Sequence, residues 1–343
     1  MNAPDIAMLL ARAGHHADIH EIRILAHGGN NRTWFVDADG ERYVVKQYFR
    51  HADDTRDRLK AEFDFTRYAS SLLPDCVPQP IAQDAGEGLA VYRFMPGEVL
   101  RPGQIGQPEV DAAVHFFCSL NDPRRRDAAS NLPEASEACF ALSDHLSLIG
   151  KRIACLSEVM NEPGTDADAA NLIDRLSQRW KVLQMEVIEA AQRTGLAVSD
   201  ALPVEQRCVS PSDFGFHNAL RDSDGTIRFL DFEYAGWDDP AKMTGDFFAQ
   251  LAVPVPATYF NGFVSAALGH FPDASTLRLR AALLRPVYQI KWCCIALNVF
   301  LPVHLARRKF ANPALDETAL KRQQLVKAQN LFQSLEPIRH GLH

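Results

Sequence analysis

Three polar side chains in the segment 209–240 have the chemistry to hold a divalent cation. Asp213 and Asn218 belong to one polar cluster, and Asp231 begins a second cluster directly after the apolar run 227–230. Between them, the residues 222–225 (Asp-Ser-Asp-Gly) are typical of a hairpin turn, because Asp and Gly tolerate the positive φ that such turns need. A hairpin would bring both clusters together, and hard oxygens suit Mg²⁺ beside substrate phosphates. The sequence therefore predicts a phosphoryl-transfer site.

A lysine inside an apolar strand could supply the nucleotide side of this site. Lys46 lies in the predicted strand 42–48, where alternation places it on one face with Val44 and Tyr48. Glu62 lies on the helix predicted over 57–73. Kinases use a lysine–glutamate pair between a strand and the next helix to hold the lysine against nucleotide phosphates. The alternative interpretation is a surface lysine and a surface glutamate without a common role.

The N-terminal part of the chain has the pattern of a small β-rich lobe. Strands are predicted over 22–25, 34–36, 42–48 and 89–95, and helices over 4–12 and 57–73. The glycine-containing segment 27–33 could cradle a phosphate with its backbone N–H groups, although an ordinary hairpin turn explains it equally well. The turn signal Pro96-Gly97 ends the strand pattern. We therefore predict a first lobe over residues 1–97.

Beyond Gly97 the pattern changes to helices. They are predicted over 110–120, 140–156, 171–193, 242–251, 256–269, 277–300 and 315–335. The apolar segment 292–305 is shorter than the roughly 20 residues that span a bilayer, and we interpret it as a buried helix. A second, mainly helical lobe is thus expected over residues 98–343, which makes the fold α+β with two lobes.

The composition limits the classes of partner. The chain has 343 residues and a net charge of −7, which argues against a nucleic-acid surface and offers no basis for a membrane partner. Its seven cysteines are odd in number and contain no C-x-x-C pair, so we expect reduced thiols and a cytoplasmic location. The N-terminus lacks the pattern of a signal peptide. The oligomeric state stays open.

Taken together, these residues resemble the aminoglycoside phosphotransferase/choline kinase family, which shares the protein-kinase-like two-lobed fold. The resemblance is strongest over 28–46, 92–97 and 209–247. It implies an ATP-dependent phosphotransferase that uses Mg²⁺ and a small-molecule hydroxyl acceptor.

The resemblance also implies a role for each matching residue on the nucleotide side. The loop over the phosphates would contain Gly28, Gly29, Asn30 and Asn31. The strand lysine would be Lys46 and its partner on the helix would be Glu62. The hinge that binds adenine through its backbone would comprise Arg93, Phe94 and Met95.

On the catalytic side, the resemblance assigns the acceptor hydroxyl to Asp213 and Mg²⁺ to Asn218 and Asp231. The family usually has a His-Gly or similar pair before this aspartate, whereas this chain has Pro211-Ser212. Proline also fixes the local backbone, so we expect the loop to be preserved. The departure leaves a regulatory, nucleotide-binding pseudokinase open as the alternative. A polypeptide substrate is disfavoured, because no extended Ser/Thr/Tyr segment precedes residue 246.

The acceptor is the least defined part of the prediction. Acidic candidates for its pocket are Glu233, Asp238, Asp239 and Asp246, which would favour a cationic group. Asp238 and Asp239 could equally cap the helix that follows, and Glu233 could brace Asp231 instead of lining the pocket. His217 could contact substrate, with packing or solvent exposure as the alternative. A sugar, an amino sugar or an amino alcohol is the expected class.

Overall fold

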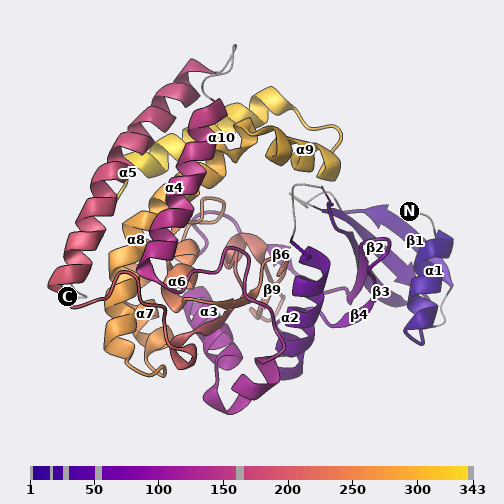
Figure 1. The fold of residues 1–343 in the computed structure, drawn as a ribbon. Coiled ribbons are helices and arrows are strands. Elements are labelled where there is room, and N and C mark those ends of the chain that lie inside the picture. Colours follow the sequence, from indigo (N-terminus) through magenta and orange to yellow (C-terminus); the bar gives the residue numbers. More distant parts are fainter. Residues whose placement is uncertain (1–2, 16–17, 26–30, 51–55, 160–165, 339–343) are drawn as a thin grey trace.

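The structure, a computed structural model, describes residues 3–15, 18–25, 31–50, 56–159 and 166–338. Figure 1 shows a sheet with flanking helices from the N-terminal part of the chain beside a larger helical lobe. This arrangement confirms the predicted α+β, two-lobed fold. The lobe boundary at Gly97 follows the last strand of the large sheet and remains a prediction.

The N-terminal sheet is antiparallel, with the strand order β1-β2-β3-β5-β4. Its strands are β1 (Ile19–Ile24), β2 (Arg32–Ala38), β3 (Glu41–Gln47), β4 (Pro80–Asp84) and β5 (Leu89–Arg93). Asp39 and Gly40 have φ values of 52° and 81° and form the turn between β2 and β3, as the twist of a tight hairpin requires. The sequence analysis did not find β4. It is an edge strand whose first residue is Pro80, a position that tolerates the missing N–H.

One helix covers each face of this sheet. On one face, α1 (Ala3–Arg12) packs Leu9 and Leu10 into an apolar cluster with Val45 and Val91. On the other face, α2 (Arg58–Leu72) contributes Phe63 and its neighbours to a second cluster. Helix α2 also contributes Phe65 and Tyr68 to the core of the helical lobe, so it lies between the two lobes. An element that touches both lobes is well placed to position a residue in the cleft.

The helical lobe surrounds a large apolar core. Its α-helices are α3 (Gln107–Leu120), α4 (Leu142–Val159), α5 (Ala167–Arg193), α6 (Pro240–Ala249), α7 (Phe260–Leu268), α8 (Ala274–Leu297), α9 (Pro302–Ala311) and α10 (Glu317–Gln333). Its short strands are β6 (Glu98–Val99), β7 (Cys208–Ser210), β8 (Ala219–Arg221), β9 (Ile227–Phe229) and β10 (Gly236–Asp238). The 3₁₀ turns are η1 (Pro123–Ala129), η2 (Val204–Gln206), η3 (Phe216–Asn218), η4 (Ala257–Tyr259) and η5 (Asn298–Phe300).

The apolar segment 292–305 is not one helix, which corrects the sequence-based interpretation. Helix α8 ends at Leu297, and α9 begins at Pro302. Proline disfavours helical backbone in the residue before it, and Leu301 is extended with φ −86° and ψ 128°. Within the described part of the chain, no single helix is long and apolar enough to cross a bilayer, although the bent pair α8–α9 meets that criterion by length and composition.

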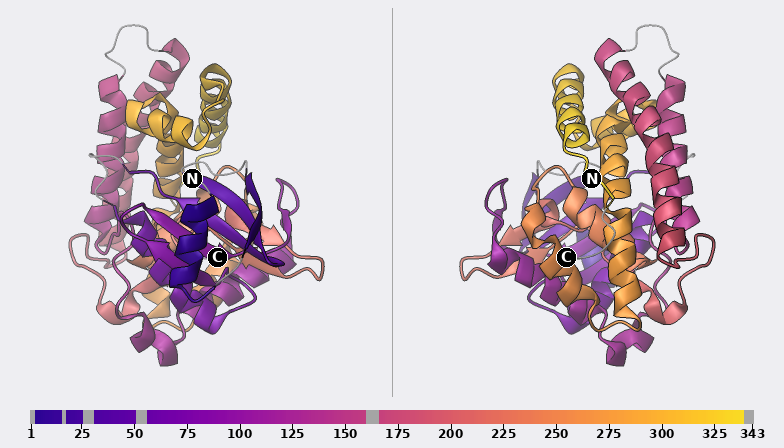
Figure 2. Two further views of the ribbon diagram at one scale, coloured as in Figure 1. Left: turned by 90° about the vertical axis from the view of Figure 1, so that its right-hand side faces the viewer. Right: turned by 90° about the vertical axis from the view of Figure 1, so that its left-hand side faces the viewer.

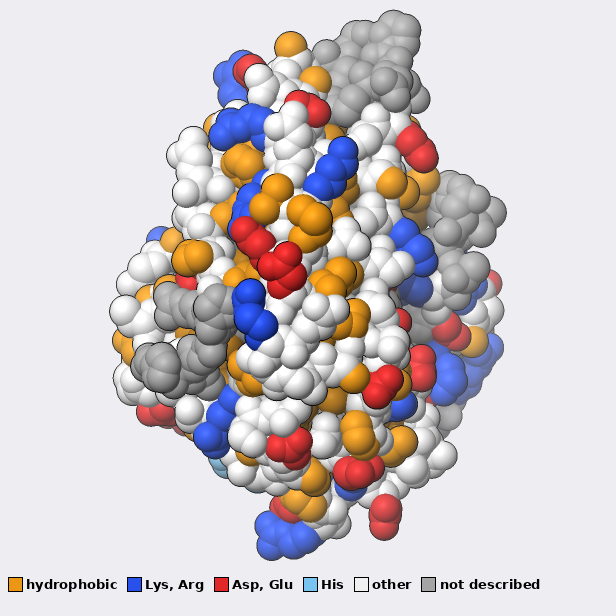
Figure 3. Space-filling model, turned by 60° about the vertical axis from the view of Figure 1, so that its left-hand side comes forward, with side chains coloured by type: hydrophobic (Ala, Val, Ile, Leu, Met, Phe, Trp, Pro, Cys, Tyr) orange, Lys and Arg blue, Asp and Glu red, His pale blue; other side chains and the backbone are white. Residues whose placement is uncertain are grey.

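On the face of the molecule drawn in Figure 3, acidic and basic side chains are interspersed and do not gather into separate patches. Figure 2 shows α4 and α5 as a long pair that extends beyond the rest of the helical lobe.

All seven cysteines are free thiols, in agreement with the prediction.

Candidate active site

A β-hairpin brings the two polar clusters together, as the sequence predicts. Strands β8 and β9 are antiparallel, and Gly225 in the connecting turn has φ 89°. Beyond the strands, the N–H of Leu230 donates to the carbonyl oxygen of Asn218 over 2.8 Å. Asn218 therefore precedes one strand and Asp231 follows its neighbour, at the same end of the hairpin.

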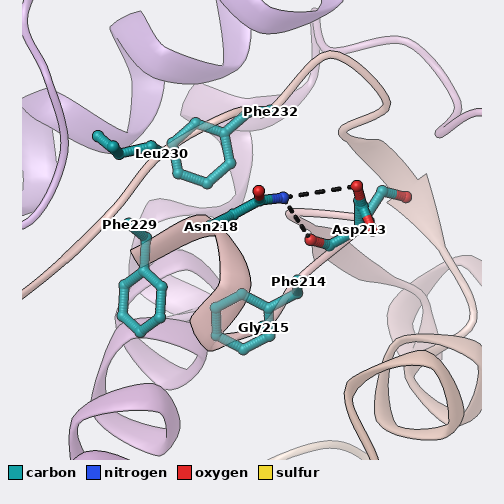
Figure 4. A pocket seen from close by; sticks show the side chains of 8 residues that line it. Asp213, Phe214, Gly215, Asn218, Phe229, Leu230 and Phe232 are labelled. Atoms are coloured by element: carbon teal, nitrogen blue, oxygen red, sulfur yellow. Dashed lines mark hydrogen bonds between the residues drawn. The ribbon is translucent and has the colours of Figure 1, made fainter. Parts of the chain in front are cut away.

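Phenylalanines fix the backbone on which these polar residues lie. The rings of Phe214 and Phe216 are buried against Phe229 and Phe247, with centroid distances of 5.0–6.3 Å. After Asp231, the ring of Phe232 packs against Phe65 of α2 at 4.7 Å. Figure 4 shows Phe214, Phe229 and Phe232 beside the Asp213–Asn218 pair. Because apolar rings alternate with polar residues here, packing of the rings turns the polar side chains toward the cleft.

Asp213 is held by two of its neighbours. The side-chain nitrogen of Asn218 donates to the carbonyl oxygen of Asp213 at 3.1 Å and to its Oδ2 at 3.4 Å, as Figure 4 shows. Nε2 of His217 lies 3.2 Å from Oδ1 of Asp213. Burial alone would raise the pKa of Asp213, but His217 and Asn218 stabilise the carboxylate and hold the pKa below its ordinary value. Asp213 is therefore ionised at neutral pH.

His217 is a neighbour of Asp213, a contact that the sequence analysis did not predict. Its ring packs edge-on against Trp292, with the centroids 6.3 Å apart. Gly215 accommodates this ring, because a Cβ at Gly215 would lie 2.9 Å from Nδ1 of His217. The spacing of four residues between Asp213 and His217 was the signal that could have suggested the pair.

The oxygens at the end of the hairpin fit a divalent cation. Because the amide nitrogen of Asn218 donates to Asp213, its Oδ1 is left without a part in this contact and points away from it. The Asp231 carboxylate is 34% exposed, so one of its oxygens remains accessible while the other binds Lys46. Amide and carboxylate oxygens are the ligands that Mg²⁺ prefers. Asn218 and Asp231 could therefore hold this ion together with phosphate oxygens.

Lys46 joins the two lobes at this point. Its Nζ lies 2.8 and 2.7 Å from the two carboxylate oxygens of Glu62 and 2.6 Å from Oδ1 of Asp231. The predicted contact between Lys46 and Glu62 is thus present. Burial alone would lower the pKa of Lys46, but the carboxylates of Asp231 and Glu62 outweigh it and raise the pKa well above its ordinary value. Lys46 is accordingly a fixed positive charge that faces the cleft.

Two tyrosines that the sequence analysis did not assign support the Lys46–Glu62 pair. The hydroxyl of Tyr48 donates to Oε2 of Glu62 at 2.7 Å and lies 2.9 Å from the hydroxyl of Tyr92. Tyr48 shares a strand face with Lys46, which was the available signal. Tyr92 comes from the neighbouring strand β5, and only the sheet register reveals its proximity.

The predicted phosphate loop is described only in part. Gly28, Gly29 and Asn30 lie outside the described residues. Asn31 is buried, and its Nδ2 donates to Oε2 of Glu233 at 2.8 Å. Glu233 is therefore a buried contact between the lobes, and it does not brace Asp231 through a hydrogen bond within the described part of the chain.

The predicted hinge follows β5. The N–H groups of Arg93 and Phe94 donate to the carbonyl oxygens of Gln79 and Arg42, at 2.8 and 2.9 Å. These two N–H groups are consequently engaged within the N-terminal lobe. Backbone recognition of adenine would fall to the remaining polar groups of the segment, including those of Met95.

The Pro211-Ser212 pair is part of an ordered loop. Ser212 adopts the left-handed conformation with φ 49°, and its N–H donates to Oγ of Ser210 at 3.1 Å. Before the loop, Asn121 bonds both the N–H and the carbonyl oxygen of Val209, at 2.7 and 3.0 Å. The loop that presents Asp213 is thus well supported without a histidine before the aspartate.

Three of the acidic residues that the sequence suggests for the acceptor pocket form buried ion pairs. Asp246 accepts from Lys291 at 2.8–2.9 Å and from the Trp292 indole at 2.8 Å. The other pairs in this group are Asp238 with Lys242 and Asp239 with Arg280 and His145. Asp239 also caps α6 by accepting from the N–H of Ala241 at 2.7 Å, as one of the alternatives predicts. Buried charges need such partners, and each of the three carboxylates has one, so their role toward a cationic acceptor stays a prediction.

Comparison with known proteins agrees with this geometry. Residues 21–275 match the model of the phosphotransferase enzyme family. No curated protein matches the sequence significantly. Similar solved structures include the choline kinase of Cryptosporidium parvum Iowa II, which is 14% identical, with 92% of this chain and 90% of that chain covered and a TM-score of 0.58.

Two further structures are comparably similar. Spectinomycin phosphotransferase in complex with ADP and spectinomycin is 12% identical, with coverages of 97% and 99% and a TM-score of 0.60. A choline/ethanolamine kinase family protein from Mesorhizobium loti is 17% identical, with coverages of 92% and 88% and a TM-score of 0.55. At such identities the likeness establishes the fold alone. Because the family match spans most of the chain and the fold agrees with it, this protein belongs to the phosphotransferase enzyme family.

Proposed function

We propose that this protein is an ATP-dependent, Mg²⁺-requiring kinase that transfers the γ-phosphate to a hydroxyl group of a small molecule. The observation that supports this most strongly is the position of Lys46. Its ammonium group contacts Glu62 of the N-terminal lobe and Asp231 of the helical lobe at 2.6–2.8 Å. A cation shared in this way lies where nucleotide phosphates and a metal would meet.

The roles of the residues follow from their chemistry. Lys46 would hold non-bridging phosphate oxygens, and Asn218 and Asp231 would hold Mg²⁺. When bound, this ion would neutralise the negative charge that develops on the phosphates. Asp213, ionised and oriented by His217, would accept the proton of the acceptor hydroxyl. Phosphoryl transfer needs mainly such positioning and charge neutralisation.

The loop over the phosphates and the hinge complete the proposal. Gly28, Gly29 and Asn30 would cover the phosphates, and the segment 93–95 would contact adenine. Residues 1–97 would form the nucleotide-binding lobe and residues 98–343 the lobe that binds the acceptor. A sugar, an amino sugar or an amino alcohol is the proposed class of acceptor. The free thiols suit a reducing compartment such as the cytoplasm.

A screen of ADP release tests the proposal. The purified chain would be incubated with Mg-ATP and a panel of sugars, amino sugars, sugar acids and amino alcohols. At least one acceptor should raise turnover, and Asp213→Asn should lower that turnover by about 10²–10⁴-fold, the usual contribution of a general base. Asp174→Asn, on the exposed face of α5, is the matched control and should keep full activity.

Two results would count against an active kinase. If no hydroxyl compound raises ADP release and Asp213→Asn leaves the background rate unchanged, the kinase assignment fails. A thermal shift with Mg-ATP under those circumstances would instead support the nucleotide-binding pseudokinase.

A further inference from the structure

Helix α9 belongs to the helical lobe and contacts the N-terminal lobe. In Figure 1 it extends from the helical lobe toward the N-terminal sheet. Near its end, the carbonyl oxygen of Phe310 accepts from Nε of Arg32 at 3.1 Å, and the Phe310 ring packs on the Arg32 guanidinium and on Phe49. Both partners belong to the N-terminal lobe. The helix therefore bridges the two lobes, and we call the side that carries Arg307 its inner face.

The inner face of α9 is basic. Nη1 of Arg307 donates to the Tyr234 hydroxyl over 3.3 Å, and Nη2 of Arg307 lies 3.0 Å from Nδ1 of His304. Tyr234 follows Asp231 closely in the chain, so these contacts direct the helix toward the end of the hairpin that carries the site. Burial and the surrounding guanidinium groups, Arg307 first among them, lower the pKa of His304 to about 4. His304 is therefore neutral at pH 7, and the positive charge here belongs to arginines.

Among the residues that the structure describes, these arginines have no carboxylate partner, unlike Lys242, Arg280 and Lys291 of the same lobe. Nε of Arg307 is buried without a hydrogen-bond partner among the described residues. Arg308 is partly buried, and its guanidinium group forms no hydrogen bond or ion pair with any described residue. Burial and then Arg307 lower the pKa of Arg308, which directly follows Arg307 on α9, and the Arg307 side chain contacts Tyr234. A partly buried guanidinium without an anion is unfavourable, unless an anion arrives with a ligand.

The acidic side chains of the helical lobe that could attract a cation already have partners. The carboxylates of Asp238, Asp239 and Asp246 are neutralised by Lys242, Arg280 and Lys291. Glu233 bonds Asn31 at the lobe interface. The site thus offers a cationic acceptor no uncommitted carboxylate among these four residues, while Arg307 and Arg308 offer an anion several free N–H donors.

We propose that Arg307 and Arg308 bind an anionic group of the acceptor, a carboxylate or a phosphate, while its hydroxyl meets Asp213. This rests on the proposed kinase function and changes its acceptor class, from amino sugars and amino alcohols to hydroxy acids, sugar acids or phosphorylated sugars and alcohols. Planar guanidinium groups bind both kinds of oxyanion through paired N–H donors. The anion would supply the negative charge that this part of the protein lacks.

Matched acceptors test the charge preference. ADP release would be measured with glucuronate, glucose 6-phosphate, glucose and glucosamine, and with glycerate, glycerol 3-phosphate, glycerol and ethanolamine. We expect turnover with an anionic member of either series. Its kcat/KM should be at least about 10-fold above the kcat/KM of its neutral and cationic counterparts, which is the contribution of a charged hydrogen bond. Preference for a neutral or cationic compound would overturn the anionic acceptor while leaving the kinase intact. Absence of turnover with every compound would overturn both.

Variants locate the group that recognises the anion. Arg308→Gln should raise the KM of the anionic acceptor by about 10- to 100-fold and leave the KM of ATP unchanged. Arg308→Lys should restore part of the loss, because it keeps the charge. Arg322→Gln, on the exposed face of α10, is the control and should change neither constant. A rise in the KM of ATP, with the acceptor KM unchanged, would assign Arg308 to the nucleotide and overturn the proposal.

Discussion

Two of the lysines that bind carboxylates in this protein, Lys291 and Lys46, differ in their surroundings. Lys291 and Asp246 lie within the helical lobe with side chains 7% and 8% exposed, and the Trp292 indole completes the Asp246 shell. Lys46 contacts carboxylates of both lobes, and one of these, Asp231, is 34% exposed. The first pair is closed and serves the core. The second opens on the cleft, which is where a lysine can exchange a protein carboxylate for a ligand phosphate.

The closed pair should matter most for stability. Lys291→Met removes the partner of a buried carboxylate, and such losses cost about 3–5 kcal/mol. The free energy of unfolding from urea titration is expected to fall by that amount. Lys321→Met, which removes a lysine from a half-exposed pair with Glu317, should change it by no more than about 1 kcal/mol. Equal losses for the two variants would contradict the distinction between closed and exposed pairs.

The open pair should matter most for activity. Lys46→Met removes the fixed charge that would face the phosphates, and loss of one preorganised group of this kind costs about 10²–10³-fold in kcat. Its unfolding free energy should fall less than that of Lys291→Met, because the Tyr48 hydroxyl still donates to the buried Glu62 carboxylate and water can solvate the partly exposed Asp231. Steady-state kinetics and urea titration on both variants would check that Lys46→Met loses more activity and that Lys291→Met loses more stability. A Lys46 variant that keeps full kcat would remove the lysine from the proposed mechanism.

A third prediction concerns Asp239, another buried carboxylate of the helical lobe, and the dependence of stability on pH. Burial alone would raise the pKa of Asp239, but Arg280 and His145 outweigh it and lower the pKa from 3.8 to about 2. The unfolded chain then binds more protons than the native one between these values, so stability is lost as the pH falls from about 4 to about 2. The shift corresponds to about 2 kcal/mol.

This loss should be visible in the pH dependence of the unfolding free energy. Asp239→Asn removes the titrating group. The slope of its unfolding free energy against pH should therefore be smaller than that of the original chain in this window, by the equivalent of up to one bound proton. The variant is also expected to be less stable at pH 7, because Arg280 loses its partner. Parallel curves for the two proteins would show that Asp239 does not carry the acid sensitivity.

The sequence was sufficient where local rules apply. Asp-Gly turn chemistry and strand alternation placed Asp213, Asn218 and Asp231 at one end of a hairpin, and the strand–helix order placed Lys46 opposite Glu62. The pairing of buried charges could not be predicted in this way. Asp246 pairs with Lys291, a partner 45 residues further along the chain, and no periodicity reveals such a contact. The available signal was a lysine inside an apolar helix, which must find a counter-charge.

Helix α9 shows the same limit at the level of an element. Pro302 marks the break between α8 and α9, and proline at the first helical turn is a readable signal. The direction that α9 then takes depends on contacts with Arg32 and Phe49 of the other lobe. Such contacts join residues distant in sequence, so the basic wall of the cleft could not be predicted.

The smallest expected effect concerns how the open pair is held. Tyr48 donates to Glu62 at 2.7 Å, and Tyr48→Phe removes this hydrogen bond without changing the size of the ring appreciably. The loss is worth about 1 kcal/mol, which corresponds to about a fivefold decrease in kcat/KM if it falls on the transition state. Tyr43→Phe, on the opposite face of β3, is the control, since its hydroxyl lies 3.5 Å from Nδ1 of His15 and away from Glu62.

If Glu62 matters only by balancing the charge of Lys46, Tyr48→Phe should leave kinetics unchanged and lower stability alone. If its orientation matters, the fivefold loss should appear in kcat while the apparent Tm stays within a few degrees, and that outcome would separate positioning from charge in the open pair.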